Sequence, residues 1–224
     1  MKTNFGVKST LPANYKLSNG YNLYEWVMRK KCFPSFWGRP ISGDNAIDLN
    51  ELEFFQQKQC KVMLVFDDFN ELDIASSDGT NSAIKAINAA IDLGIPQNDK
   101  YAIYVIVPSD WCINHNWMIS FAETLSSHGY IPAFVGNTDS SDNFNFDRET
   151  SHYVQALSEN NLFETVFGAT EPKVNGSPET WTPYCPSAFK QSDIKLWICD
   201  EMSFNDIKIP CIYVRNMNTL DNMY

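Results

Sequence analysis

Short apolar runs alternate along this chain with longer segments in which apolar residues recur every three or four positions. The first pattern is typical of strands buried on both faces, and the second is typical of amphipathic helices. The clearest strand covers residues 60–66 and ends abruptly at Asp67 and Asp68. A helix is expected over 81–93, with Gly94 as its C-terminal stop. This alternation predicts an α/β fold built on a parallel sheet.

The same unit repeats through the middle of the chain. Strand, helix, strand and helix patterns follow one another at residues 101–107, 114–127, 130–136 and 149–159. Continuous apolar strands joined by helices pair in parallel with their neighbours in sequence. We therefore expect the strands at 61–66, 101–107 and 130–135 to be adjacent, parallel and central.

The flanks of the chain carry weaker patterns. Before the first clear strand we expect strand, helix, strand and helix at residues 3–9, 21–31, 33–42 and 49–59. An apolar run at 162–168 precedes the Pro-, Gly- and Thr-rich segment 170–186, where no helix is expected, and a late strand is expected at 193–199. About seven or eight strands predict a (β/α)8-like TIM barrel, with room for irregularity in its C-terminal third. An open doubly wound sheet fits the count almost as well.

Composition narrows the class of protein. With 224 residues, 44% of them hydrophobic, the chain is long enough for one domain, expected to span residues 1–224. Its net charge of -10 repels phosphate backbones and anionic headgroups, which argues against nucleic acid and membrane partners. No apolar run is long enough for a signal peptide or a membrane span. We expect a cytoplasmic protein, or one exported without a recognisable signal peptide.

Metal, cofactor and disulfide chemistry lack sequence support. The six cysteines are scattered without paired spacing, so we expect free thiols. His115, His128 and His152 fall on different predicted elements without metal-ligand spacing, which predicts no metal site. Glycine-rich phosphate-binding motifs are absent from the sequence, so no nucleotide cofactor is expected.

Acidic residues recur just after the predicted strands. In a parallel barrel these strand ends form the mouth, where functional groups gather. The acids in such positions are Asp67, Asp68, Asp110, Asp139, Asp200 and Glu201. Paired carboxylates at a mouth could perform acid/base chemistry on a glycosidic bond. The alternative is structural, because Asp and Asn are also common strand-exit and helix-capping residues.

Aromatic and amide side chains near the same strand ends add candidates for substrate binding. Trp111 directly follows the proline that ends one strand, and Trp197 lies in the late strand. Flat aromatic faces can stack on sugar rings, although core packing is the other common role of tryptophan. Asn137 follows a strand together with Asp139. We take these residues, with Asp200 and Glu201, as candidate substrate-binding groups.

The order of several motifs resembles the bacterial glycoside hydrolase-like domain of unknown function, which is related to the family 25 lysozymes. The motifs are the Phe-Trp-Gly-Arg-Pro strand at 36–40, Asp-Leu-Asn-Glu-Leu at 48–52, the strand at 61–66, the helix end at 89–96 and Ile-Tyr-Val at 103–105. The run Leu-Trp-Ile-Cys at 196–199 is similar to a late strand of the lysozymes. The resemblance covers residues 33–137 best and implies a barrel that acts on, or binds, polysaccharide.

The chain departs from the family pattern at the acids. Where the family's first strand carries an aspartate, this chain has Lys8 after Gly6-Val7. Where the family has an acid-x-acid pair, this chain has Pro108-Ser109-Asp110. Only Asp110 then matches the second acid, which is the proton donor in the lysozymes. The resemblance thus implies a reduced set of catalytic acids.

Two functional hypotheses follow. The first is a non-catalytic barrel that binds glycan, such as a polysaccharide or peptidoglycan fragment, or serves as an interaction module; Lys8 and Pro108 favour it. The alternative is a lysozyme-like hydrolase with Asp110 as general acid and Asp67 or Asp68 as base or electrostatic partner. The sequence leaves the ligand, the oligomeric state and the convergence of the acids open.

Overall fold

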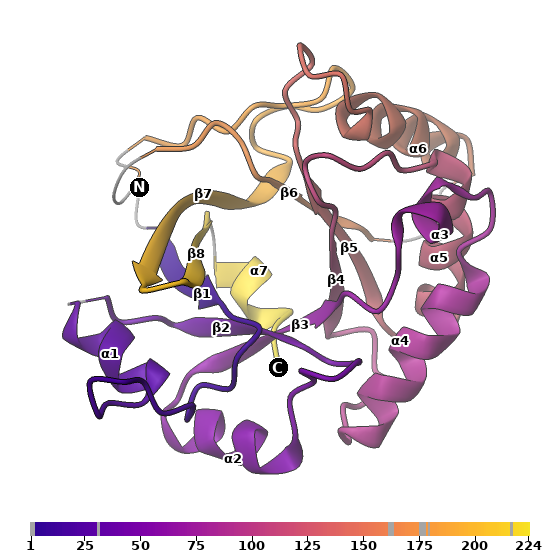
Figure 1. The fold of residues 1–224 in the computed structure, drawn as a ribbon. Helices are drawn as coiled ribbons and strands as arrows, with labels where there is room; N and C mark the ends of the chain where they lie inside the picture. Colours follow the sequence, from indigo (N-terminus) through magenta and orange to yellow (C-terminus); the bar gives the residue numbers. More distant parts are fainter. Residues whose placement is uncertain (1–2, 31, 161–163, 175–177, 179, 216) are drawn as a thin grey trace.

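A computed structural model describes residues 3–30, 32–160, 164–174, 178, 180–215 and 217–224. Its strands close into one barrel in the order β1 to β8 (Figure 1). The strands are β1 (Asn4–Lys8), β2 (Phe36–Pro40), β3 (Lys61–Phe66), β4 (Ala102–Ile106), β5 (Ile131–Gly136), β6 (Val166–Ala169), β7 (Ile194–Phe204) and β8 (Ile207–Val214). Closure confirms the predicted barrel and excludes the open doubly wound sheet.

Helices connect most of the strands, and all except the C-terminal one, which closes one end of the barrel, form the outer layer. They are α1 (Leu23–Arg29), α2 (Leu49–Gln57), α3 (Glu71–Ala75), α4 (Thr80–Asp92), α5 (His115–Ser127), α6 (Phe146–Asn160) and α7 (Met217–Asp221). The longer helices agree with the predicted ones to within a few residues at each end. The short helices α3 and α7 were not predicted, because five residues are too few to show a helical period.

Strand pairing follows the predicted parallel order from β1 to β7. The three predicted central strands are neighbours, since β3 pairs in parallel with β4 and β4 with β5. The C-terminal third is irregular, because β8 runs antiparallel to both β7 and β1. The prediction that the late strand ends at residue 199 is wrong. β7 continues through Asp200 and Glu201 and turns at Asn205, which has a φ of 50° that suits a tight hairpin turn.

The barrel interior is filled by side chains that alternate along the strands. These inward residues form a buried apolar cluster that includes Phe36, Met63, Val65, Ala133, Val135, Leu196, Ile198 and Ile212. Leu220 and Met223, from α7 and the residues just after it, belong to the same cluster. The backbone of Tyr224 exchanges hydrogen bonds of 2.7 and 3.0 Å with Val62 at the start of β3. The C-terminal segment therefore closes one end of the barrel and leaves the carboxyl ends of the strands as the mouth.

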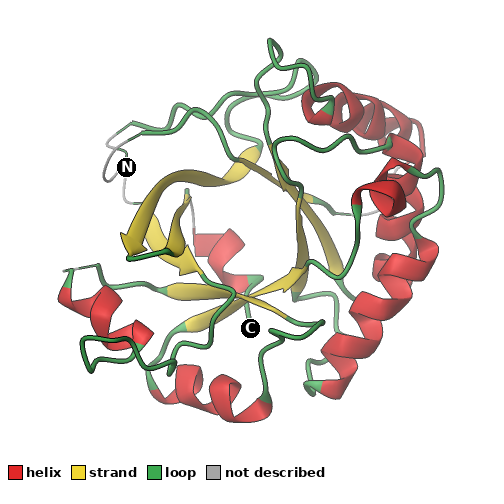
Figure 2. Cartoon of the chain, in the orientation of Figure 1, coloured by secondary structure: helices red, strands yellow, loops and turns green. Residues whose placement is uncertain are grey.

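The outward residues of the strands pack against the helices. Helices cover much of the barrel wall, whereas loops cover the wall beside β6 and β7 (Figure 2). Several contacts hold this loop layer; among them, the Thr138 hydroxyl donates to the carbonyl of Tyr184 at 2.7 Å, and the ring of Trp181 meets that of Trp197 edge-on at a centroid distance of 5.8 Å. Within the described residues, all six cysteines are free thiols, and no helix is long and apolar enough to cross a membrane.

Candidate functional site

Lys8 and Asp67 place opposite charges at the mouth. Lys8 is the last residue of β1, and Asp67 directly follows β3, so both side chains start from carboxyl ends of strands. On the intervening strand, Gly38 pairs with Lys8, and a Cβ atom at Gly38 would lie only 3.3 Å from Lys8 Cβ and 3.4 Å from Cγ. The Lys8 side chain therefore lies over Gly38, where the missing side chain leaves room for it.

The charges of Lys8 and Asp67 influence each other's pKa across Gly38. Burial lowers the pKa of Lys8, and the negative charge of Asp67 acts in the opposite direction. Burial raises the pKa of Asp67, against the lowering effect of the Lys8 and Arg39 charges. Among the described residues, Lys8 and Asp67 do not form an ion pair within 4.0 Å. Lys8 is half-buried and Asp67 is exposed, and no direct salt bridge joins them.

The neighbouring Arg39 is held differently. Its guanidinium is fully buried and donates to Glu51 Oε1 at 2.9 Å and to Glu51 Oε2 at 3.1 Å. The remaining donors reach the carbonyls of Ser9, Thr10 and Asn45 at 2.7–3.0 Å. All five N–H groups of the arginine are thus used. Arg39 and Glu51 therefore fix the loops that follow β1 and β2, and they offer no free donor to a ligand.

Three adjoining cavities run along the mouth on the side of β1, β2, β3 and the β7–β8 hairpin. Their volumes are about 260, 550 and 370 Å³. The first and second share Thr10, and the second and third share Glu201 and Pro210. We call this series the mouth groove. Its charged lining comprises Asp44, Asp67 and Asp68 in the first cavity, Lys8, Glu201, Asp206 and Lys208 in the second, and Lys173, Asp200 and Glu201 in the third.

Four of the acids predicted from the sequence line the mouth groove. Asp67 and Asp68 lie at one end of it, and Asp200 and Glu201 lie at the other. Asp68 forms an exposed ion pair with Lys85 at 3.8 Å. These acids are spread along the groove from the first cavity to the third.

Asp110 and Trp111 occupy the loop between β4 and α5. Asp110 is exposed there and does not line the mouth groove. Trp111 is half-buried, and its ring meets Phe69 edge-on with centroids 6.2 Å apart. Asp110 was predicted to lie in the mouth beside Trp111; Trp111 contacts Phe69, which follows Asp68, whereas Asp110 is not among the residues that line the groove.

The other predicted binding residues have structural contacts. Asn137 is buried; its amide donates to Asp142, and its carbonyl oxygen accepts from the Asp139 backbone at 2.9 Å. Asp139 accepts from Ser141, which lowers the pKa of this carboxyl. Trp197 is fully buried and belongs to the outer core layer. It packs the core because its position on β7 alternates out of the barrel, so it cannot stack on a sugar in the mouth.

Sequence reasoning missed two polar groups inside the barrel. The Tyr104 hydroxyl and the Thr170 hydroxyl are buried and have no hydrogen-bond partner in the described part of the chain. Burial raises the pKa of Tyr104, so the phenol stays neutral. Tyr104 points inward on β4, where it belongs to the interior cluster, and Thr170 directly follows β6. A tyrosine in an apolar strand gives no signal of which face it takes until the register is known.

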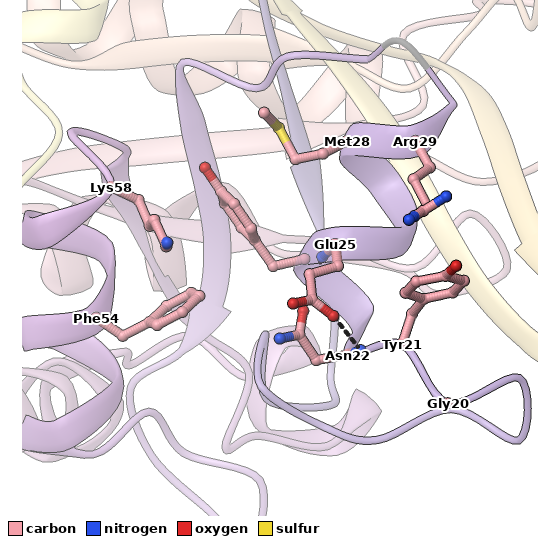
Figure 3. Close-up of a pocket in the computed structure, with 9 residues that line it drawn as sticks. Gly20, Tyr21, Asn22, Glu25, Met28, Arg29, Phe54 and Lys58 are labelled. Atoms are coloured by element: carbon pink, nitrogen blue, oxygen red, sulfur yellow. Dashed lines mark hydrogen bonds between the residues drawn. The ribbon is translucent and has the colours of Figure 1, made fainter.

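Another cavity, of about 470 Å³, lies outside the barrel between α1 and α2 (Figure 3). Arg29 lies over the Tyr21 ring at 4.0 Å, and Lys58 lies over the Phe54 ring at 5.6 Å. The Glu25 side chain accepts from the Asn22 backbone as part of a capping box. The charged groups of this cavity are therefore engaged in helix capping and cation–π contacts.

The comparisons with known proteins bear on the fold. No family model matches the chain, and no curated protein matches it. An uncharacterized B. stearothermophilus protein has a similar crystal structure, with a TM-score of 0.78 at 21% identity over 99% of this chain and 100% of that one. The Mycobacterium tuberculosis Tat-secreted protein Rv2525c is also similar, in complexes with HEPES and with L-tartrate. Its TM-scores are 0.58 and 0.56, at 11% identity over 96% of this chain and 95% of that one. At these identities the likeness establishes the shared barrel fold.

Proposed function

We propose that the protein is a non-catalytic glycan-binding barrel that holds its ligand in the mouth groove. The observation that carries this proposal is Lys8, a cation at the end of β1 where the resembled family has an aspartate. A lysine cannot stabilise the positive charge that develops on the sugar carbon during glycoside hydrolysis. It can donate charge-assisted hydrogen bonds to the hydroxyl and carboxylate oxygens of a bound glycan.

The shape and charge of the mouth groove support an extended ligand. Three adjoining cavities suit successive units of a chain better than one compact molecule. Their lining mixes lysines with carboxylates, which matches a glycan bearing both acidic and amino substituents. A peptidoglycan fragment has this chemistry, because its lactyl and peptide groups supply carboxylates and amines.

A lysozyme-like hydrolase is the second candidate, and Asp67 favours it. Burial raises the pKa of this carboxyl, which is the property required of a general acid. In this alternative Asp67 would protonate the leaving oxygen, with Asp110 or Asp68 as the second acid. The alternative requires a second carboxylate on the opposite side of the sugar.

Binding and cleavage should be measured together on the same samples. The native protein is mixed with insoluble peptidoglycan and with chitin-type oligomers, and both bound protein and released reducing ends are followed. We expect binding without release of reducing ends. Lys8→Met should weaken binding about tenfold, the loss expected for one charge-assisted hydrogen bond. Lys100→Met is the matched control, because Lys100 is exposed and precedes β4 at the closed end of the barrel.

The outcomes separate the two candidates. Cleavage that disappears in Asp67→Asn or Asp110→Asn would establish the hydrolase and overturn the non-catalytic proposal. Absence of binding to both glycans, or equal loss in Lys8→Met and Lys100→Met, would remove the mouth groove as a glycan site.

A further inference from the structure

Two histidines and a glutamate converge where α5 packs against α6 (Figure 1). His115 is the first residue of α5, and Glu149 and His152 lie three residues apart on α6. Residues with this spacing share one face of a helix. One donor atom from each side chain lies within 4.8 Å of those from the other two. The cluster was not predicted from the sequence, because the two histidines lie on different predicted elements and lack metal-ligand spacing along the chain.

Glu149 is the buried centre of this cluster. Its Oε2 atom contacts His115 Nδ1 at 2.7 Å and accepts from the His115 backbone N–H at 3.1 Å. Its Oε1 atom accepts from Arg148 Nε at 3.0 Å. A carboxylate held at both oxygens is oriented before any ligand arrives, as metal-binding carboxylates commonly are.

The backbone on both sides of the cluster is also fixed. The Asn145 side chain donates to the Ile113 carbonyl at 2.9 Å and accepts from the Ile113 N–H at 3.0 Å. This pair ties the loop before α5 to the start of α6, so the spacing of His115 and Glu149 is set by the scaffold. His152 is exposed, with its ring 5.3 Å from that of His115 and inclined at 78°. It is the ligand that is free to adjust.

We propose that His115, Glu149 and His152 bind a divalent transition-metal cation, with Zn²⁺ the best match. Two imidazoles and one carboxylate form a ligand set used by zinc in sites that keep a fourth position open. Bonds of about 2.0–2.2 Å in a tetrahedron place the donor atoms roughly 3.4 Å apart. His115 Nδ1 and Glu149 Oε2 lie 2.7 Å apart, and all three donor atoms lie within 4.8 Å of one another. Binding therefore requires a small side-chain rotation that separates His115 from Glu149 and a second one that adjusts His152.

Coordination replaces the contact between His115 and Glu149. A ring nitrogen of neutral His115 donates its lone pair to the cation, and Glu149 Oε2 becomes a ligand instead of a hydrogen-bond acceptor. The proton that the two side chains share moves to the other ring nitrogen or to water, so charge and protons balance.

The fourth position is open to solvent. His152 lines a cavity of about 570 Å³ together with Asp147, Ser151 and Ser187. Water or a small anion could therefore complete the coordination of the cation. This site lies between the helices outside the barrel, so it is separate from the mouth groove and does not depend on the glycan proposal.

The test uses the full-length protein freed of metal with a chelator and then titrated with Zn²⁺ and with Co²⁺. Calorimetry should show one strong site, and the Co²⁺ form should show visible absorption of a tetrahedral centre without thiolate charge-transfer bands. His152→Ala should weaken Zn²⁺ binding by about tenfold or more. Because His152 is exposed, this variant should keep its fold, which circular dichroism would verify.

Two controls separate this site from other zinc ligands in the chain. His128→Ala removes the third histidine, which caps α5 at its other end and contacts the Thr124 carbonyl at 2.8 Å. Cys112→Ser removes a half-buried thiol close to His115 in sequence. Both variants should bind Zn²⁺ like the native protein. Equal binding by His152→Ala and native protein, a thiolate band with Co²⁺, or no binding at millimolar Zn²⁺ would overturn the proposal.

Discussion

Arg39–Glu51 and Lys8–Asp67 are two pairs of opposite charges in the same part of the barrel wall, and they are satisfied to different degrees. Arg39 is fully buried, and each of its five donors has an acceptor. Lys8 is half-buried, Asp67 is exposed, and the two make no direct ion pair. In the first pair, all the hydrogen-bond donors of the arginine hold loops in place. In the second pair, the charged groups can still form hydrogen bonds with a ligand.

In this barrel, the burial of a charged side chain and the number of its hydrogen bonds together indicate whether its role is structural or functional. A buried charge whose hydrogen bonds are all made has nothing left for a ligand, and removing its partner is costly. A partly dehydrated charge without a salt bridge can gain hydrogen bonds from a ligand at little desolvation cost. We call the Arg39–Glu51 pair, with the loop carbonyls that it binds, the Arg39 clamp. By this criterion a ligand should bind in the mouth groove and not at the Arg39 clamp.

The largest expected effect comes from breaking the Arg39 clamp. Glu51→Ala should lower the free energy of unfolding by about 3–5 kcal/mol, because it leaves the buried guanidinium without its carboxylate. Glu51 also accepts from the Ala13 backbone at 2.7 Å, so the loop after β1 should loosen as well. Urea denaturation measures the loss.

Glu53→Ala is the matched control for this prediction, because Glu53 is exposed on the same helix. It should change the free energy of unfolding by less than about 0.5 kcal/mol. A double variant, Arg39→Met with Glu51→Met, should recover much of the loss, since no uncompensated charge remains. Equal effects of Glu51→Ala and Glu53→Ala would show that the clamp is not structural.

The fold was predictable from the sequence where the local pattern of apolar and polar residues determines the secondary structure. The parallel strands β3, β4 and β5 are continuous apolar runs, and the helices between them have clear periods and stops. The β7–β8 hairpin was not predicted, because Asp200 and Glu201 look like a strand end. Pairing with β8 extends β7 beyond these two acids. The hairpin turn contains no glycine, so the sequence lacks the usual signal for a hairpin at this point.

The candidate site was only partly predictable. Asp67, Asp68, Asp200 and Glu201 were found because strand ends converge in a barrel. The burial of Trp197 depends on which face of β7 it takes, and the local sequence does not reveal this. The His115–Glu149–His152 cluster depends on how α5 packs on α6, so only tertiary structure reveals it.

The next prediction concerns pH and Asp67. Burial raises the pKa of this acid in the folded protein, so ionising it costs more when folded than when unfolded. Its contribution to stability is therefore fully present below the unfolded pKa and is lost as pH rises through the folded pKa. Asp67→Asn removes this loss. The variant should be more stable than the native protein at neutral pH and about as stable as it at about pH 3.

Thermal unfolding from acidic to neutral pH would check the Asp67 prediction. Asp92→Asn is the control, because Asp92 is exposed at the end of α4, so the change removes one carboxyl group without altering the mouth groove. A gain that is the same at both pH values, or a loss at neutral pH, would contradict the assigned sign.

The smallest change in stability is expected for the substitution Gly38→Ala. A methyl group there meets Lys8 Cβ at 3.3 Å and Cγ at 3.4 Å, so the base of the Lys8 side chain, with the β1 backbone that carries it, must shift by a few tenths of an ångström. Gly38 has no positive φ that would strain alanine. The reduced freedom of the unfolded chain offsets the crowding, so Gly38→Ala should keep stability within about 0.5 kcal/mol of native.

The informative readout of Gly38→Ala is electrostatic. Displacing Lys8 weakens its compensation of Asp67, so the pKa of the Asp67 carboxyl should rise further above its ordinary value, as followed by carboxyl carbon NMR. Gly168→Ala is the contrasting variant, because its Cβ would meet the Leu196 backbone oxygen at 3.0 Å, which cannot move aside. That variant should lose stability and leave the Asp67 pKa unchanged. An unchanged Asp67 pKa in Gly38→Ala would mean that Lys8 does not compensate Asp67 across the Gly38 gap, and the two charges would then have to be treated as independent.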